Sequence, residues 1–365
     1  MPEYTANYNL IKPRYDETAD IKVINENMDT IDGILKENAD GLSTHSSKAA
    51  STSASGHVQL QTTVDNSETT ALTPKALNTH VADGASHSKT ARFVVGTSTA
   101  GWTAKDCDYL CNGTNDTEII NSAIQALPAT GGEIILLDGI YTVKYPDQRK
   151  ITLKSNVLLR GNGVGTIIQP SLNYPYAQNL IQVSGNNVSI CNLAIKPNGT
   201  HSALRSVETS TGISGLRIQY CYIGLSILFS QGSDFLIADN KFEACSLSLF
   251  EAVTLSKICG NSFFSAEYNG ISLERLSSSI VTGNLIQDFG TAHSGIKLGS
   301  GTGDYGGNIV VNNIIRQTTA GSSIGINISG SGSKKNLVMG NHIVGVKTGI
   351  RDVGSDNVIE YNIIN

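Results

Sequence analysis

A six-residue pattern, apolar-x-x-Asn-x-apolar, recurs along the second half of the chain. Successive fourth positions of the pattern are 28, 19, 21, 23, 29, 28 and 21 residues apart. Such a recurrence is typical of solenoids, in which each repeat forms one coil that stacks on the next. Two early copies carry Leu193 and Cys221 at the fourth position, and six carry asparagine: Asn240, Asn261, Asn284, Asn313, Asn341 and Asn362. An asparagine that recurs at a bend can stack its amide on the same residue one coil away, and it tolerates a left-handed backbone.

A second pattern, apolar-x-apolar, follows most copies of the first. It occurs at 225–227, 247–249, 271–273, 296–298 and 326–328, often directly after a glycine. Alternate residues of an extended strand point to the same side, so each segment predicts a short strand with two inward side chains. Short strands joined at an asparagine bend predict a parallel β-helix, because a β-sandwich would not repeat an asparagine in register.

Near the N-terminus the apolar residues follow a helical period instead. Over residues 19–36 they are spaced by three and four, which is the a/d seam of a coiled coil, and they are Ile21, Ile24, Met28, Ile31 and Leu35. Isoleucine at both a and d positions favours trimers. The pattern predicts a coiled-coil helix that assembles a homotrimer. The alternative is an amphipathic helix that packs on its own domain.

Residues 41–56 are rich in Ser, Thr, Ala and Gly, which predicts a flexible linker. In the next segment, 57–92, a short strand at His57-Val58-Gln59-Leu60 precedes a helical turn that starts at Pro74. The Val-Gln-Leu strand and the run Ala71-Leu72-Thr73-Pro74-Lys75-Ala76-Leu77 resemble the tail-fibre repeat of bacteriophages. The head, residues 1–40, resembles N-terminal segments of phage tail proteins through Tyr8-Asn9-Leu10-Ile11-Lys12-Pro13. This resemblance implies attachment to phage tail or baseplate proteins through the N-terminus.

The remaining stretch, 93–365, resembles another family. Residues from Asn115 to Glu118 form a variant of the capping box and predict a helix over about 115–127, followed by a strand over 133–137. The run from Asn112 to Glu118, with Gly131-Gly132-Glu133-Ile134 and Gly139-Ile140-Tyr141, resembles the opening of the pectate-lyase-like superfamily. The resemblance implies an all-β, right-handed parallel β-helix whose first coil is capped by this helix.

Composition and charge exclude several other classes. Charged residues make up only 16% of the 365 residues, which is too low for a coiled coil throughout or an acidic disordered chain. Residues 1–40 hold nine acidic and four basic residues, which accounts for the whole net charge of −5. The neutral body lacks the basic stripe of a nucleic-acid-binding protein. No apolar run is long enough to span a bilayer, and we expect no membrane insertion.

The chain shows no secretory signal, so we expect synthesis in the cytoplasm. The resemblance to phage tail proteins implies that this is the cytoplasm of a host bacterium and that the protein has its place in the virion tail. The six cysteines are scattered and predict free thiols in a reducing compartment. Cys107 and Cys111 have no second pair at a zinc-ligand spacing, so we predict no metal and no cofactor.

Three carboxylates just past the asparagine bends are candidate catalytic residues. Residues at one pattern position form a column on the wall, and carboxylates one or two coils apart approach the spacings of retaining or inverting glycosidases. The predicted catalytic residues are Glu243, Glu267 and Asp288. Side chains suited to sugar binding lie in the same stretch, and we predict a substrate-binding role for Tyr268, Glu274, Arg275, His293 and Lys297. Alternatively, these charged residues only solvate the wall.

Two function classes stay open, because a fold alone does not specify function. One is a phage tailspike-like depolymerase that binds and cleaves a bacterial surface polysaccharide, with hydrolysis favoured over elimination. The other is a non-catalytic receptor-binding or structural tail fibre. A free polysaccharide lyase or epimerase fits less well, since only Arg275 or Lys297 offers a base beside a uronate. The sequence ends within an asparagine-bearing coil, so we expect a partner or a further segment to cover the open strand edge.

Overall fold

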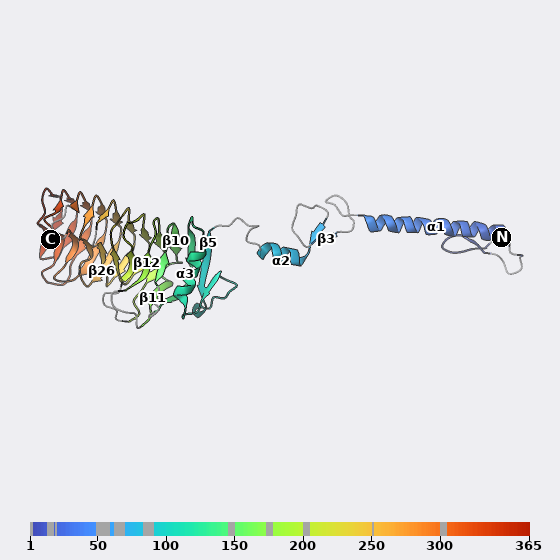
Figure 1. Ribbon diagram of the computed structural model, residues 1–365, viewed down its shortest axis with the longest axis horizontal. Helices are drawn as coiled ribbons and strands as arrows, with labels where there is room; N and C mark the ends of the chain where they lie inside the picture. Colours follow the sequence, from blue (N-terminus) through green and yellow to red (C-terminus); the bar gives the residue numbers. More distant parts are fainter. Residues whose placement is uncertain are drawn as a thin grey trace. The chain divides into compact units, whose positions relative to one another are not determined.

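The computed structural model describes residues 3–12, 18, 20–48, 59–61, 70–82, 91–144, 150–172, 178–199, 205–249, 252–299 and 305–365. The chain divides into two compact units, Met1–Lys89 and Thr90–Asn365. Figure 1 shows the first unit as helices and short strands and the second as a stack of coils. The predictions for residues 49–58 and 83–90 lie outside the described residues.

The first unit contains one long helix, α1 (Ile21–Ser47), which Asp20 caps by accepting a hydrogen bond from the Lys22 backbone N–H at 2.8 Å. No residue of α1 is buried, and the heptad seam is exposed, with Ile21 69% and Leu35 61% accessible. We expected a helix over 19–36 and a linker from 41. Instead α1 continues through 41–47, where the Thr44 hydroxyl bonds to the Asp40 carbonyl one turn back.

The other elements of this unit are short. An antiparallel pair, β1 (Glu3–Tyr4) and β2 (Ile11–Lys12), is held to α1 by Asn27, whose amide bonds both backbone groups of Ile11 at 2.7 and 3.0 Å. The strands β3 (Gln59–Gln61) and β4 (Thr70–Leu72) pair in parallel. The helix α2 (Pro74–Ala82) starts at the proline that the sequence marked.

The second unit is built of parallel sheets that run along the stack of coils. Sheet 1 has twelve strands among the described residues, in spatial order β40 (Val358–Glu360), β37 (Leu337–Met339), β33 (Ile309–Val311), β29 (Ile280–Thr282), β25 (Lys257–Cys259), β21 (Leu236–Ala238), β17 (Arg217–Gln219), β13 (Ser189–Cys191), β10 (Val157–Arg160), β7 (Gly132–Leu136), β5 (Arg92–Thr97) and β6 (Tyr109–Cys111). A short 3-10 helix, Ser98–Ala100, follows β5.

Sheet 2 follows sheet 1 in each coil. Its ten described strands are β41 (Ile363–Ile364), β38 (His342–Val344), β34 (Ile314–Arg316), β30 (Leu285–Phe289), β26 (Ser262–Ala266), β22 (Lys241–Glu243), β18 (Tyr222–Ile223), β14 (Ala194–Ile195), β11 (Thr166–Pro170) and β8 (Gly139–Val143).

Sheet 3 comes next, with nine strands in the described part of the chain: β39 (Thr348–Asp352), β35 (Ile324–Ile328), β31 (Ser294–Leu298), β27 (Ile271–Leu273), β23 (Leu247–Leu249), β19 (Ser226–Phe229), β15 (Arg205–Thr209), β12 (Asn179–Val183) and β9 (Ile151–Leu153). Sheet 4 lies between sheets 3 and 1 and consists, where described, of β16 (Ile213–Ser214), β20 (Gly232–Ser233), β24 (Val253–Thr254) and β28 (Leu276–Ser277); β32 (Tyr305–Gly306) and β36 (Ser333–Lys334) pair separately.

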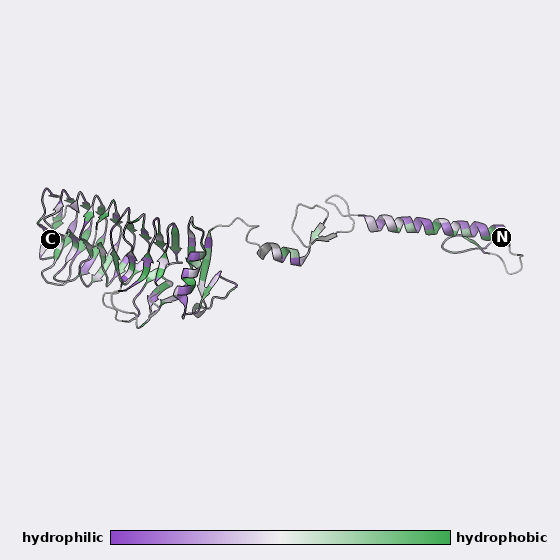
Figure 2. Cartoon of the chain, viewed as in Figure 1, coloured by the Kyte–Doolittle hydropathy of each residue, from purple (hydrophilic) through white to green (hydrophobic). Residues whose placement is uncertain are grey.

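The predicted parallel β-helix is confirmed. In most strands of the coils, alternate side chains point inward and are buried, as in Ile237, Ile258 and Val281 on successive strands of sheet 1. Phe242 and Phe263 stack in the core with ring centroids 4.3 Å apart and an interplanar angle of 9°. In Figure 2 the strands of the coils are coloured mainly as hydrophobic, in agreement with this narrow apolar core.

The recurring asparagines form the predicted ladder at the bend between sheets 1 and 2. The Asn284 side chain, for example, accepts from the backbone N–H and the amide of Asn261 at 3.1 and 3.0 Å and donates to Asn313 at 2.9 Å. The left-handed backbone falls one residue earlier than expected. Asp239, Gly260 and other residues directly before the asparagines have positive φ, whereas the asparagines themselves do not.

A second ladder, which the sequence patterns did not predict, lies at the bend between sheets 4 and 1. Backbone N–H groups bond to the side chain one coil on, as from Ser279 to Asn308 at 3.1 Å and from Asn308 to Asn336 at 3.1 Å. The ladder positions change from serine at 256 and 279 to asparagine at 308, 336 and 357, so no single recurring residue type marked this bend.

The glycines at the start of several strands of sheet 3 have a packing role. A Cβ on Gly295 would lie 2.5 Å from Ile315 Cγ2 and 2.9 Å from the Gly325 carbonyl oxygen. A larger residue would push sheets 2 and 3 apart at this corner, so glycine recurs there.

The helix α3 (Asp116–Ala126) packs on the first strands of the coil stack, as Figure 1 shows, and buries Ile120, Ala123 and Ile124. Its start differs from the predicted capping box, because the Asn115 side chain makes no capping hydrogen bond. Instead the buried Asp116 carboxylate accepts from the backbone N–H groups of Gly113 and Thr142, at 2.8 and 2.9 Å.

We predict that Asn284→Ala lowers the free energy of unfolding by about 2–5 kcal/mol, because it leaves buried partners in two neighbouring coils without hydrogen bonds. Urea denaturation followed by circular dichroism measures this loss. The exposed Gln231 provides the control, and Gln231→Ala should change stability by less than about 0.5 kcal/mol. Equal effects of the two substitutions would contradict a stabilising role for the ladder.

Candidate functional site

A hollow of about 260 Å³ lies on the outer face of sheet 3 and at its corner with sheet 2. Its walls are polar side chains from three successive strands of sheet 3, from the corner loops that precede three strands of that sheet, and from the residue that follows β27. The lining residues are Ser226, Ser246, Ser248, Tyr268, Asn269, Ser272, Glu274 and His293. The hollow therefore lies on the stretch where the sequence predicted a sugar-binding groove.

The floor consists of short polar side chains at outward positions of the sheet. Ser248 and Ser272 are register partners on β23 and β27, and Lys297 on β31 continues the same column. Each serine lies between two inward apolar residues, as the alternation of a strand requires. Small hydroxyl side chains leave space at the surface and offer donors and acceptors.

The corner supplies the aromatic side of the hollow. The rings of Tyr268 and His293 meet edge to face, with centroids 5.4 Å apart and an interplanar angle of 82°. Tyr268 is 55% exposed. Asn269 is held in place because its side-chain oxygen accepts a hydrogen bond from the Ser294 backbone N–H at 2.8 Å. A half-exposed tyrosine beside fixed polar groups is a surface on which a sugar ring can lie.

An ion pair lies at the edge of the hollow, next to Glu274. Lys297 Nζ lies 3.7 Å from Glu274 Oε1, and the two side chains are 26% and 23% exposed. Glu274 is the single carboxylate among the residues that line the hollow. Of the five predicted substrate-binding residues, Tyr268, Glu274 and His293 line the hollow and Lys297 contacts it through this pair.

Arg275 lies apart from this group. Its guanidinium carbon is 5.7 Å from the centre of the Tyr305 ring. The strand β27 ends at Leu273, so the chain has turned by residue 275 and leads into sheet 4.

The three predicted catalytic carboxylates do not form one column. Glu243 on β22 is paired in register with Phe264, and Phe264 with Gln287. Ser265 and Asp288 occupy bend positions with φ near 54°, and Glu267 follows that bend. The prediction of a single acidic column is therefore wrong, because the three carboxylates occupy different register positions: Asp288 lies one position, and Glu267 three positions, past the position that Glu243 holds on its own strand. None of the three carboxylates is among the residues that line the hollow.

Glu243 belongs to a surface network on sheet 2. Tyr222 Oη donates to Glu243 Oε2 at 2.9 Å, and Lys241 Nζ lies 2.9 Å from the same oxygen. The hydrogen bonds from Lys241 and Tyr222 hold the pKa of Glu243 below its usual value. Burial, together with the bond to Glu243, raises the pKa of Tyr222 to about 12. Lys196 and Lys241 each lie 5.3 Å from the centre of the Tyr222 ring.

Asp288 stabilises the bend between sheets 2 and 3. Its Oδ1 accepts hydrogen bonds from the backbone N–H and the hydroxyl of Thr318, one coil further on, at 2.9 and 2.6 Å. Partial burial alone would raise the pKa of Asp288, but these hydrogen bonds outweigh it and hold the pKa below its usual value. Glu267, by contrast, is exposed next to Tyr268.

Sequence reasoning missed the serines and Asn269. The signal was present in the second pattern, since the middle residue of 247–249 and of 271–273 is serine in both copies. Comparing the middle residues of consecutive copies, which face outward, would have shown this column of serines.

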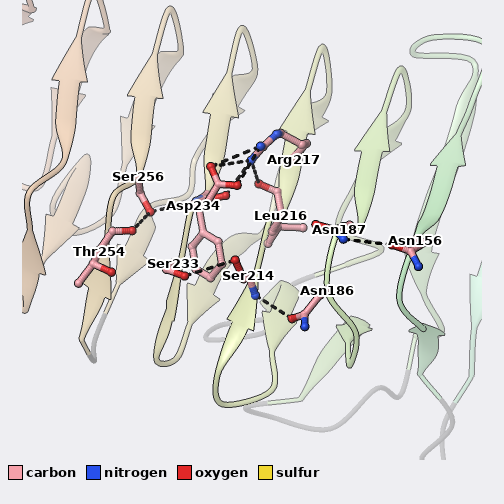
Figure 3. A network of polar contacts seen from close by, with 11 residues as sticks. Asn156, Asn186, Asn187, Ser214, Leu216, Arg217, Ser233, Asp234, Thr254 and Ser256 are labelled. Carbon is pink, nitrogen blue, oxygen red and sulfur yellow. Dashed lines mark hydrogen bonds and ion pairs between the residues drawn. The ribbon is translucent and has the colours of Figure 1, made fainter.

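Another polar cluster lies at the bend between sheets 4 and 1 (Figure 3). Arg217 forms a bidentate ion pair with Asp234, with Nη2 3.0 Å from Oδ2, and also bonds the Asp234 carbonyl at 2.7 Å. Asn187 donates to Asn156 at 3.1 Å, and the Ser214 backbone N–H donates to Asn186 at 2.9 Å. Figure 3 shows these contacts joining neighbouring coils, so the cluster has a structural role.

Within the described residues, no group of three or more His, Cys, Asp and Glu side chains is arranged to hold a metal ion. The six cysteines are free thiols. No described helix has the length and apolar character needed to cross a bilayer.

No family model matches the sequence, and no curated protein matches it. Several solved structures are similar. DFA-IIIase from Arthrobacter chlorophenolicus A6, without its lid and in complex with GF2, is 15% identical with a TM-score of 0.57, and the match covers 76% of this chain and 90% of that one. The body is a right-handed parallel β-helix. The parallel β-helix fold that the resemblance implied is thus confirmed.

Two phage proteins are also similar. The Dettilon tailspike protein is 18% identical with a TM-score of 0.49, and the match covers 64% of this chain but only 48% of that protein, about half its length. A tailspike mutant of E. coli bacteriophage HK620, in complex with a pentasaccharide, is 15% identical with a TM-score of 0.48, covering 68% and 52%. At these identities the similarity concerns the fold.

We predict that Thr318→Val destabilises the protein by about 1–3 kcal/mol at pH 7, because it removes a hydrogen bond to the ionised Asp288 carboxylate. A carboxyl group with a lowered pKa stabilises the fold above its ordinary pKa of about 3.9 and loses that contribution as the pH falls through its folded pKa. The difference from the unchanged protein should therefore shrink below about pH 4. Urea denaturation between pH 7 and 3 measures it, with Thr319→Val as control. A difference that does not vary with pH would contradict this role for Asp288.

Proposed function

We propose that this chain is a receptor-binding protein of a phage tail, of the tailspike type, and that the hollow on sheet 3 binds a bacterial surface polysaccharide. The observation that carries the proposal is the composition of the hollow: hydroxyl and amide groups, one half-exposed tyrosine and one ion pair. Sugars present many hydroxyl groups and weakly apolar ring faces, which such a surface matches. The phage-like head and the β-helix fold support a place in the virion tail.

Binding is better supported than cleavage. Glycoside hydrolysis uses two carboxylates, one on each side of the scissile bond. Among the residues that line the hollow, Glu274 is the one carboxylate, and it is paired with Lys297. The catalytic roles of Glu243, Glu267 and Asp288 stay predictions, of which Glu267 is the best placed because it neighbours Tyr268.

We also propose that α1 assembles three copies of the chain. Its seam carries isoleucine at both kinds of core position, and Ile24 and Ile31 are 37% and 38% exposed along a helix with no buried residue. An isolated amphipathic helix of this kind is stable when like helices cover its apolar side.

We predict that Tyr268→Ala weakens binding to the host polysaccharide at least about tenfold, the loss expected when one aromatic contact is removed. Isothermal titration calorimetry with purified polysaccharides from candidate hosts measures it. Tyr220, at a bend between sheets 1 and 2, is 59% exposed and provides a matched control, and Tyr220→Ala should leave affinity unchanged. Equal losses in both variants would refute the assignment of the hollow.

The same polysaccharides distinguish binding from cleavage. We expect bound polymer to show no new reducing ends and no absorbance from an unsaturated uronate. New reducing ends that disappear in Glu267→Gln would establish a hydrolase, and unsaturated product would establish a lyase.

We predict that Ile31→Lys converts the trimer to monomer, because it places three charges in one layer of the helix seam. Multi-angle light scattering on the full chain measures the mass. Thr30→Lys, one residue away and off the seam, should remain trimeric. A monomeric unchanged protein would refute the trimer, and a trimeric Ile31→Lys would refute assembly through α1.

A further inference from the structure

The outward column of sheet 3 continues past the hollow and becomes cationic. After Ser248 and Ser272 it contains Lys297 on β31, Asn327 on β35 and Arg351 on β39, which are register partners in turn. Neighbouring coils are about 4.8 Å apart, so Lys297 and Arg351 lie about 10 Å from each other along the column. A bound chain that leaves the hollow in this direction meets all three side chains.

The two cations differ in their partners. Lys297 is paired with Glu274 at 3.7 Å. Arg351 is exposed and forms no ion pair with any residue that the structure describes. The opposite end of the column is balanced, because Glu208 is paired with Arg205 at 3.3 Å. Among the described residues of this column, the positive charge without an acidic partner, Arg351, thus lies on one side of the hollow.

Two polar groups on this side are buried without partners. Asn327 is 9% exposed and its Oδ1 has no hydrogen-bond partner among the described residues. Ser323, 1% exposed, has an unpartnered hydroxyl, and the next residue, Ile324, donates its backbone N–H to the carbonyl of His293 in the hollow. Buried polar groups are nearly always hydrogen-bonded, so unpartnered ones beside a hollow indicate a missing ligand or water.

We propose that the polysaccharide extends from the hollow along β31, β35 and β39 and carries a negatively charged group, a carboxylate or a phosphate, which binds between Lys297 and Arg351. The Arg351 guanidinium presents a planar fork that suits either anion, and the amide of Asn327 lies between the two cations in register to bond neighbouring hydroxyl groups. The proposal rests on the proposed function and adds to it the chemical class of the polymer.

The test uses the full chain and a panel of bacterial surface polysaccharides. Each acidic polymer is paired with its own carboxyl-reduced or dephosphorylated form, and neutral polymers are included. We expect binding to an acidic polymer, lost by at least about tenfold on removal of the acidic group and weakened by added salt. Loss of binding on carboxyl reduction would identify the group as a carboxylate, and loss on dephosphorylation would identify it as a phosphate.

Substitutions assign the effect to the column. Arg351→Gln should weaken binding to the acidic polymer by about 10- to 100-fold, the loss of one charge-assisted contact. Arg316 on β34 is an exposed arginine of sheet 2, and Arg316→Gln should leave affinity unchanged. Both variants replace exposed side chains, so circular dichroism should confirm that both are folded.

The outcomes separate the two proposals. Binding that depends on Tyr268 but is equal for the acidic and the modified polymer would overturn the anionic site and leave the proposed function intact. Equal effects of Arg351→Gln and Arg316→Gln would also overturn the anionic site. Absence of binding to every polymer on the panel would refute the proposed function, and the anionic site with it.

Discussion

The fold depends on hydrogen bonds between identical side chains in neighbouring coils. Asparagines within the ladder satisfy a backbone N–H and an amide of the previous coil and donate to the next asparagine, for example from Asn313 to Asn341 at 3.0 Å. Because the groups are buried, a shift of one coil by a single residue would leave several of them without partners. This constraint fixes the register of sheets 1 and 2, and the coils can then differ freely in their other loops.

Because the register is fixed, residues at the same position of successive repeats lie next to one another on the surface of sheet 3. The middle residue of each sheet 3 strand faces outward, so Ser248, Ser272, Lys297, Asn327 and Arg351 lie in one line although they are 24 to 30 residues apart in sequence. The coil stack thereby provides a long polar face suited to an extended polymer. Asp288 lies one register position past the column of Glu243, Phe264 and Gln287, and there it accepts hydrogen bonds from Thr318.

Much of the fold was predictable because its determinants are local and repeat. The asparagine bends, the short alternating strands and the helix at Asp116–Ala126 follow from periodicity and from a resemblance at the start of the body. The site was predictable only in part. Tyr268, Glu274, His293 and Lys297 meet as expected, whereas Glu243 lies in a separate network with Tyr222. Counting from the preceding asparagine places Glu243, Glu267 and Asp288 three, six and four residues along, but the count does not show which residues of other coils bond each side chain.

The sequence by itself determined the β-helix, the apolar seam of the N-terminal helix and the stretch of wall on which the candidate binding side chains gather. These features depend on residue type and spacing within one or two coils. The tertiary structure alone decided which side chains share a column and which carboxylates are held by hydrogen bonds or ion pairs to neighbouring residues. It also decided that Asn327 Oδ1 and the Ser323 hydroxyl have no hydrogen-bond partner among the described residues. Those properties depend on contacts between coils, and a register set by hydrogen bonds between distant residues decides them.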